Sequence, residues 1–209
     1  GHAGERVLNR ICPLGFKHNE HSLRVVDALE AGKGLNLTFE VRDGILNHTG
    51  DNLPCTLEGR VVRMADRIAY INHDIEDAIS GKVITAQQIP KECVKMFGKT
   101  IGERIDFMVK NIVQNSKEAN DIVMSKEFFE AMEALRNFMF EYVYVDSIAK
   151  KEEKKAENML ESLYMYLDKN FEVVEKELEF TSKNVPKERT ICDYIAGMTD
   201  RFAVKIFEK

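Results

Sequence analysis

Apolar residues recur at helical spacing along most of this chain, and runs that alternate apolar and polar positions are almost absent. Apolar side chains three or four residues apart form one face of an α-helix, whereas strict alternation is typical of a strand. The pattern therefore predicts an all-α fold. Helices are expected over residues 21–31, 38–49, 56–80, 100–116, 125–145, 150–170 and 186–209.

Residues that favour helix termini lie at several of these boundaries. Thr38 and Ser125 are expected N-caps, because a side-chain hydroxyl can accept a hydrogen bond from a free N–H of the first helical turn. Thr190 and Asp193 have the spacing of a capping box and are expected at the start of the last helix, with aspartate in the place of the usual glutamate.

The helix predicted over residues 56–80 has two contrasting faces. At about 100° per residue, one side is aliphatic, with Met64, Ile68, Ile71, Ile75 and Ile79. The opposite side is a column of polar groups, with Asp66, Tyr70, His73, Asp74 and Asp77. A solvated face usually mixes long charged side chains of both signs, and this column has neither lysine nor glutamate. A solvated face and a functional surface both stay open for it.

Composition limits the class of protein. The 209 residues are 44% hydrophobic and 31% charged, which is typical of a globular domain with a real core. No apolar run approaches the roughly 20 residues of a membrane span, so a soluble protein without a membrane partner is expected. The net charge of -5 argues against a general nucleic-acid binder. The four cysteines form no CxxC pair and are expected to be reduced thiols of a cytoplasmic protein.

Histidines and carboxylates supply the residue types of a hydrolytic site. His2, Glu5 and His18 lie in "GHAGE" and "FKHNEHS", and Asp66 lies in the polar column. Imidazoles can act as acid and base, a carboxylate can orient an imidazole, and an aspartate can ligate a metal. A catalytic metal needs about three or four protein ligands, and these residues offer Asp66 and one histidine. No nucleophile-elbow, phosphate-loop, HExxH or Rossmann motif occurs.

Six segments together carry a family resemblance: "GHAGE", "FKHNEHSLRVV", "GLNLT", "ADRIAYINHDIEDA", "LRNFMFEYVY" and "DYIAGMTDRFA". In this order they resemble the bacterial deoxyguanosinetriphosphate triphosphohydrolase-like proteins of the HD-domain superfamily. The resemblance implies an HD-domain-like helical bundle with additional C-terminal helices. Residues 1–120 would be the C-terminal part of the phosphohydrolase domain, and residues 121–209 a helical region packed on it. It also implies hydrolysis of a deoxynucleoside triphosphate to deoxynucleoside and inorganic triphosphate, and a homo-oligomer.

The resemblance further implies a divalent metal ion, Mn²⁺ or Mg²⁺, held by a histidine, a His-Asp dyad and a later aspartate. Asp66 corresponds to the later aspartate. The other ligands are expected upstream of "GHAGE", so we expect a fragment that binds metal poorly and turns over little. The pair His73 and Asp74 follows Asp66 and does not correspond to the dyad.

Three residues near the start correspond to catalytic positions of the family. His2 corresponds to the histidine near the scissile phosphate, Glu5 to the carboxylate that orients it, and His18 to a second active-site imidazole. The implied reaction is attack of water or hydroxide on the α-phosphorus, with His2 serving the proton transfer to the leaving 5′-oxygen.

Other residues resemble substrate contacts. Tyr70 and Asp74 resemble residues that meet the deoxyribose, with Tyr70 against the sugar and Asp74 accepting from its 3′-hydroxyl. Arg67 is expected to face a phosphate. Arg189 and Arg201 are candidates for further positive charge.

Two other functions stay open. The protein could be another HD-type phosphohydrolase, which would not release intact triphosphate, or a non-catalytic module that binds nucleotide or oligomerises. The aromatic face of the helix over residues 125–145 is compatible with an interface, although core packing is favoured for it; its members are Phe128, Phe129, Phe138 and Phe140.

Overall fold

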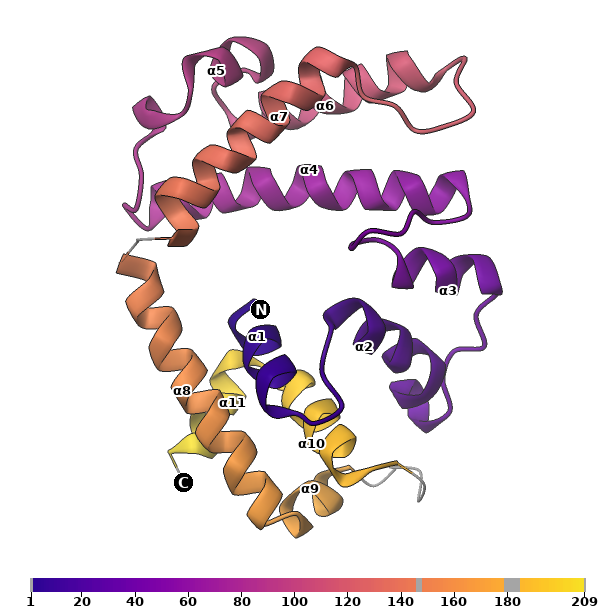
Figure 1. The fold of residues 1–209 in the computed structure, drawn as a ribbon, viewed down its shortest axis with the longest axis vertical. Coiled ribbons are helices and arrows are strands. Elements are labelled where there is room, and N and C mark those ends of the chain that lie inside the picture. Colours follow the sequence, from indigo (N-terminus) through magenta and orange to yellow (C-terminus); the bar gives the residue numbers. More distant parts are fainter. Residues whose placement is uncertain (1, 146–147, 179–184, 209) are drawn as a thin grey trace. The chain divides into compact units, whose positions relative to one another are not determined.

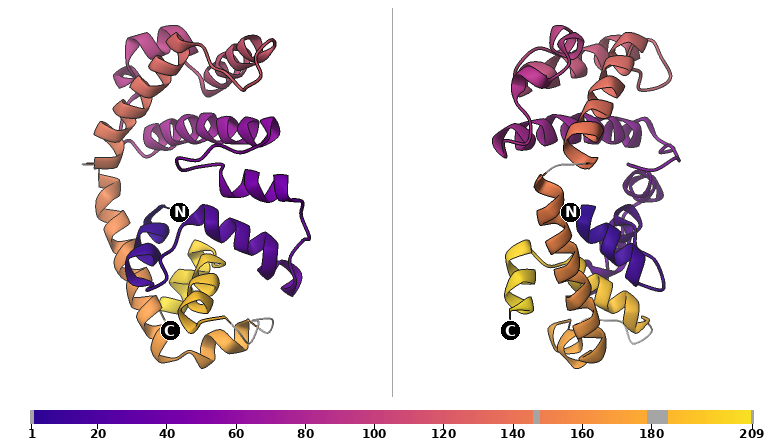
Figure 2. Two further views of the ribbon diagram at one scale, coloured as in Figure 1. Left: turned by 45° about the vertical axis from the view of Figure 1, so that its right-hand side comes forward. Right: turned by 60° about the vertical axis from the view of Figure 1, so that its left-hand side comes forward.

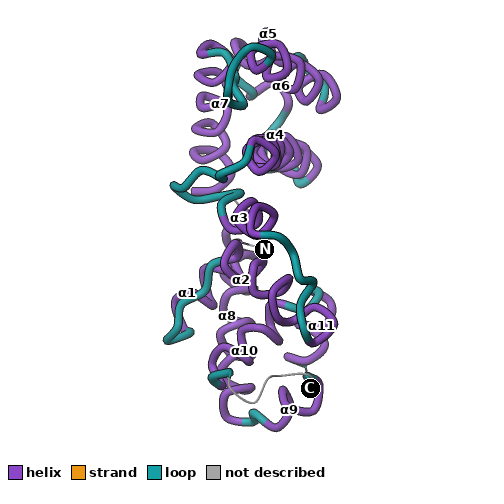
Figure 3. Tube along the Cα trace, turned by 90° about the vertical axis from the view of Figure 1, so that its right-hand side faces the viewer, coloured by secondary structure: helices purple, strands orange, loops and turns teal. Residues whose placement is uncertain are grey.

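The computed structural model describes residues 2–145, 148–178 and 185–208, and every regular element in them is a helix (Figure 1). Figure 3 shows these helices joined by loops, without a strand in this part of the chain. The predicted all-α fold is therefore confirmed. Within the described segments, no helix combines the length and the apolarity that a membrane crossing requires.

The chain forms two compact units, and the first combines an N-terminal with a C-terminal segment. Unit 1 contains Gly1–Leu46 and Lys151–Lys209, and unit 2 contains Asn47–Lys150. The predicted parts, residues 1–120 and 121–209, stay a prediction.

Unit 1 is a bundle of helices from distant parts of the sequence (Figure 2). The N-terminal segment supplies α1 (His2–Ile11), α2 (His18–Arg24), the π-helical turn η1 (Val25–Leu29), the 3-10 turn η2 (Glu30–Gly32) and α3 (Phe39–Leu46). The C-terminal segment supplies α8 (Ile148–Lys169), α9 (Glu172–Glu177), α10 (Lys187–Ala196) and α11 (Asp200–Phe207). Their shared core buries apolar side chains of both segments, among them Leu8, Phe16, Leu163, Leu167, Val174, Ile191 and Ile195.

Unit 2 is built on the long helix α4 (Leu57–Ser80). The elements that follow it are the 3-10 turn η3 (Ala86–Gln88), α5 (Lys91–Phe97), α6 (Ile101–Ser116), α7 (Lys126–Met139) and the π-helical turn η4 (Phe140–Val145). The aliphatic face predicted for α4 is confirmed, because all five of its residues pack into the unit 2 core. Burying each large aliphatic side chain contributes about 1.5–3 kcal/mol, which fixes the direction of the opposite, polar face.

Side-chain caps begin several helices, and two of them, at Thr38 and Ser125, were predicted from the sequence. The hydroxyl of Ser125 accepts from the Phe128 N–H at the start of α7, and the hydroxyl of Thr38 accepts from the Val41 N–H before α3, both at 3.5 Å. Thr100 and Glu103 form a full capping box at the start of α6. These bonds satisfy N–H groups that have no partner within the helix.

The last predicted helix is corrected in two respects. Residues 186–209 do not form one helix, because α10 ends before Gly197 and α11 starts after its N-cap Thr199. The predicted capping box is also wrong: Thr190 lies inside α10, where its hydroxyl donates to the carbonyl oxygen of Pro186 at 3.2 Å. Asp193 is buried in the helix and accepts hydrogen bonds from Arg24. Helices α1, α5 and α9 were not predicted from the sequence.

A buried arginine fixes the loop that leads into α4. The guanidinium of Arg63 donates to the backbone carbonyl oxygens of Asn47 and Asn52 at 2.9 and 3.1 Å, and to that of Gly50. Burial lowers the pKa of Arg63, as does the positive charge of Arg67. Three carbonyl oxygens replace the water that the guanidinium loses, so the loop is held through its main chain.

Candidate functional site

In unit 1, the predicted catalytic residues Glu5 and His18 meet across two helices. The Glu5 carboxylate accepts the backbone N–H of His18 at 2.8 Å, and its oxygens lie 2.9 and 3.0 Å from Nδ1 of the His18 ring. The backbone bond caps the N-terminus of α2, where the first N–H groups have no partner within the helix. A carboxylate at this end is also favoured by the helix dipole. One side chain of α1 thus fixes both the start of α2 and the ring of its first residue.

The charge state of Glu5 follows from these contacts. Partial burial alone would raise the pKa of Glu5, but the backbone N–H and the ring of His18 and the charges of His18 and His2 hold it below its ordinary value. Glu5 is therefore a carboxylate at neutral pH and can accept from an imidazole N–H. His2 lies three residues before Glu5 on α1, which places both on one side of the helix. That Glu5 orients His2 stays a prediction.

In unit 2, the polar column of α4 lies opposite its core face. Asp66, Tyr70, His73 and Asp77 are exposed, and Asp74 is half-buried. Arg67 is also exposed on α4. The predicted substrate and metal residues therefore all belong to α4, whereas His2, Glu5 and His18 belong to unit 1.

Tyr144 of η4 contacts this column, although it was not among the predicted site residues. Its hydroxyl donates a hydrogen bond to the carboxylate of Asp74. Burial raises the pKa of Tyr144, and the contacts with Asp74 and Tyr70 raise it further. The Tyr144 hydroxyl therefore keeps its proton and can donate a hydrogen bond. It lies beside Tyr70 and Asp74, the two residues that the family resemblance assigns to the sugar.

The sequence carries a partial signal for this contact. Tyr144 follows the four phenylalanines of the predicted aromatic face within the helix expected over residues 125–145, so the side on which it lies depends on the helical period. A π-helical turn adds a residue to the turn and shifts the following side chains around the axis, and such turns often occur at functional sites. Regular α-helical spacing therefore could not predict that the Tyr144 side chain contacts Asp74 of α4.

The described residues do not form a complete metal site. Among residues 2–145, 148–178 and 185–208, no three His, Cys, Asp or Glu side chains come together in a way that could hold a metal ion. Asp66 is exposed and supplies one carboxylate where a catalytic metal needs about three protein ligands.

The remaining predicted arginines lie in unit 1. Arg189 of α10 donates to the backbone carbonyl oxygen of Leu14 at 3.3 Å, and Arg201 of α11 is exposed. Their role toward a phosphate stays a prediction.

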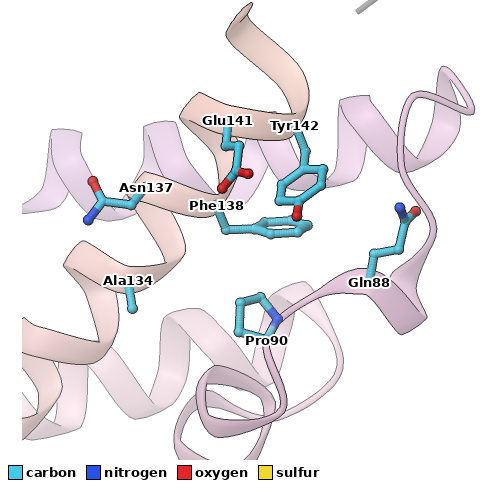
Figure 4. Close-up of a pocket in the computed structure, with 7 residues that line it drawn as sticks. All are labelled: Gln88, Pro90, Ala134, Asn137, Phe138, Glu141 and Tyr142. Atoms are coloured by element: carbon cyan, nitrogen blue, oxygen red, sulfur yellow. The ribbon is translucent and has the colours of Figure 1, made fainter. Parts of the chain in front are cut away.

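A groove of about 570 Å³ lies on unit 2 between the start of α5 and the junction of α7 with η4 (Figure 4). Its lining consists of Gln88, Pro90, Ala134, Asn137, Phe138, Glu141 and Tyr142. In its wall, the ring centroids of Phe138 and Tyr142 lie 4.9 Å apart. The lining has one carboxylate and no cation, and it contains none of the predicted catalytic, substrate or metal residues. It therefore does not suit a triphosphate.

The aromatic residues of α7 and η4 divide between two environments. Phe138 is a core residue and Phe128 packs against the same core, as the favoured interpretation predicts. Phe129 and Phe140 are 42% and 63% exposed, so the favoured prediction of core packing is wrong for these two. A role of these two in an oligomer interface stays a prediction.

One protein family matches the C-terminal part of the chain. Residues 122–209 match the phosphohydrolase-associated domain. This segment contains α7 to α11.

Curated relatives match nearly the whole chain, and each is named a deoxyguanosinetriphosphate triphosphohydrolase-like protein. The relative from Caldanaerobacter subterraneus subsp. tengcongensis is 49% identical over 205 residues, which are 98% of this chain and 60% of the relative. The relative from Clostridium perfringens strain 13 is 42% identical over 222 residues, covering 100% of this chain and 64% of the relative. That from Geobacter metallireducens is 31% identical over 265 residues, covering 100% and 68%. The chain thus spans less than two thirds of the first two relatives.

Proposed function

We propose that this chain, which belongs to the deoxyguanosinetriphosphate triphosphohydrolase-like family, is part of a dNTP triphosphohydrolase. The reaction is hydrolysis of a deoxynucleoside triphosphate to the deoxynucleoside and inorganic triphosphate. The observation that carries the proposal within the chain is the Glu5–His18 pair, with its ring contact of 2.9 Å. A carboxylate bound to an imidazole is an arrangement that enzymes use to control proton transfer.

The proton chemistry follows from this pair. Glu5 at Nδ1 favours the His18 tautomer that carries its proton on Nδ1, so Nε2 is the nitrogen without a proton. Attack of water on the α-phosphorus breaks the bond to the 5′-oxygen, which must receive a proton. His2 is the candidate donor, and His18 the second imidazole that can take up the proton of the attacking water. Water adds across one bond, so the products are deoxynucleoside and triphosphate alone.

The polar face of α4 is the candidate surface for the sugar. Asp74 can accept from a 3′-hydroxyl through an oxygen that does not bind Tyr144, since a carboxylate has several acceptor positions. The exposed ring of Tyr70 can pack on the deoxyribose. Arg67, three residues before Tyr70, is the candidate for a phosphate oxygen.

Of the metal ligands that the family resemblance implies, this chain is expected to supply Asp66 alone. The described residues do not fit a complete metal site, so no step is assigned to the ion here. We expect the 209 residues by themselves to turn over little or no substrate, and the activity to belong to a longer protein with the full ligand set.

The test is product analysis on an extended protein that carries the upstream segment implied by the resemblance. Each dNTP is incubated with Mn²⁺ or Mg²⁺, and the products are separated by anion exchange. We expect deoxynucleoside and triphosphate, a loss of both in His2→Ala, and retention of both in the matched control His48→Ala. Release of phosphate or pyrophosphate would instead indicate another phosphohydrolase. Nucleotide binding without turnover would favour the non-catalytic module.

A further inference from the structure

Helix α2, which carries His18, has little apolar packing, which includes the His21 ring against the core residue Phe16 at a centroid distance of 5.0 Å. All seven of its residues are described, and none of them is buried. Hydrogen bonds at three of its residues tie it to the rest of unit 1. Glu5 holds its first residue, and the side-chain amide of Asn19 donates to the backbone carbonyl oxygen of Leu46 at 2.7 Å. The third contact binds the last residue, Arg24, to Asp193 of α10. The position of α2 therefore depends on these contacts.

The contact between Arg24 and Asp193 is the most buried of the three. Nε of Arg24 donates to both carboxylate oxygens of Asp193 at 2.8 and 3.0 Å, and Nη2 donates to one of them at 2.6 Å. The Asp193 side chain is only 2% exposed, so water cannot replace the arginine. His21 of α2 also faces this carboxylate, with Nδ1 at 3.6 Å from Oδ1. Two residues of α2 thus lie on one buried carboxylate of the C-terminal segment.

The same segment also holds α1, which carries His2 and Glu5, through the shared apolar core that includes Leu8 and through ion pairs nearer the surface. Arg6 pairs with Glu157 at 3.0 Å, and Arg10 pairs with Glu161 at 2.8 Å, both on α8. The two arginines are 51% and 50% exposed. Exposed ion pairs contribute little, because water solvates both partners after separation, whereas a buried carboxylate that loses its partner has no replacement. Among these polar contacts, the one with Asp193 is therefore the contact whose loss should disturb α2 most, since α1 is also held by the apolar core.

We propose that Asp193 is a positioning residue that holds α2 through Arg24 and thereby keeps His18 on Glu5. This gives the segment that matches the phosphohydrolase-associated domain a specific task, which is to order helices of the candidate active site. The inference rests on the proposed function for the catalytic role of His18. The positioning itself is a property of unit 1 and can be measured without turnover.

The first test follows the carboxyl group of Glu5 in the 209-residue chain by carbon-13 NMR as a function of pH, with Glu5→Gln for assignment. Contacts with His18 hold the pKa of Glu5 low, so release of α2 should raise it toward its ordinary value. We expect this rise in Asp193→Asn and in Arg24→Gln. The matched control is Asp168→Asn. Asp168 forms an ion pair with Lys187 at 2.9 Å, and both residues of this pair belong to the C-terminal segment. This control should leave the Glu5 titration unchanged.

A purely structural role of Asp193 would lower the melting temperature but leave the Glu5 titration of the folded chain unchanged, and that result would overturn the proposal. If Asp193→Asn does not fold, Arg24→Lys decides, because lysine keeps the charge but cannot donate the paired hydrogen bonds. If neither variant folds, native-state hydrogen exchange of the unchanged chain decides. The His18 amide should then open together with the amides of α10, and a separate opening at lower free energy would refute the proposal.

The catalytic consequence is tested in the extended protein. We expect Asp193→Asn to lower kcat on the order of 100-fold with little change in KM, because misplacement of a catalytic group slows the chemical step. An unchanged kcat in an active extended protein would contradict the proposal. If the extended protein has no triphosphohydrolase activity, the proposed function fails, and the Glu5 titration still decides whether Asp193 positions α2.

Discussion

Replacing Arg104 by methionine should lower the free energy of unfolding of unit 2 by about 2–4 kcal/mol. The Arg104 side chain of α6 is 3% exposed. Its Nε donates to Oδ1 of Asn72 at 2.8 Å, its Nη1 to the carbonyl oxygen of Lys99 at 3.1 Å, and its Nη2 to Glu76 at 2.5 Å. The substitution keeps much of the apolar volume and removes all three hydrogen bonds.

The three bonds should contribute unequally, because their acceptors differ in exposure. Asn72 is fully buried, so its orphaned oxygen should cost about 1–3 kcal/mol. The Glu76 side chain is 41% exposed, and water can replace the guanidinium there for about 0–1 kcal/mol. Lys99 is exposed as well, so water also reaches its carbonyl oxygen. The bond between Arg104 and Asn72 should therefore account for most of the loss.

Urea unfolding followed by circular dichroism measures the effect, with Lys110→Met on the same helix as the control for an exposed ion pair. Glu76→Gln should cost less than Arg104→Met, and the double variant Asn72→Leu with Arg104→Met should be more stable than Arg104→Met alone, since both polar partners are then removed. The reasoning is refuted if Arg104→Met costs well under 1 kcal/mol, or if Glu76→Gln costs as much as Arg104→Met.

Three further substitutions test other contacts. Thr100→Ala removes the cap of α6 and should lower the free energy of unfolding by about 1 kcal/mol, measured in urea; an unchanged midpoint would contradict the capping role. Burial lowers the pKa of His21 below 6.5 and outweighs the opposite effect of Asp193. The unfolded chain therefore binds the proton first as pH falls below that value, so stability should decrease there, and His21→Gln should reduce this dependence in urea titrations at several pH values. Burial and the contact with Asp74 raise the pKa of Tyr144, so Tyr144→Phe should leave the tyrosinate absorbance that develops near about pH 10 unchanged. A smaller absorbance would show that Tyr144 ionises normally.

Local patterns made the helices and the direction of α4 predictable. Aliphatic spacing placed Ile68, Ile71 and Ile75 on one face, and burial then fixed the opposite face as polar. The caps at Thr38 and Ser125 were also readable, because a cap depends on residues within one turn. Helical periodicity and N-caps depend on residues within a few positions of each other, so a single sequence is enough to predict them.

Contacts between distant segments could not be derived in this way. The bond between Arg24 and Asp193 joins residues 169 positions apart, and no local spacing indicates such a partner. Asp193 was predicted as part of a cap, because its local neighbours fit that motif and its distant partner was unknown. Tyr144 was missed because a π-helical turn departs from the regular period that the prediction assumed.

The contact between Arg63 and its loop has a consequence for sequence change. Arg63 recognises three main-chain oxygens, and every residue type presents the same oxygen. The side chains of residues 47–52 other than Gly50, whose φ of 81° favours glycine, can therefore be exchanged without loss of the anchor. Insertion or deletion in the loop would instead move the oxygens away from the guanidinium. Evolution, or an engineer, can vary the chemistry of this loop beside α4 as long as its length, Gly50 and Arg63 are kept.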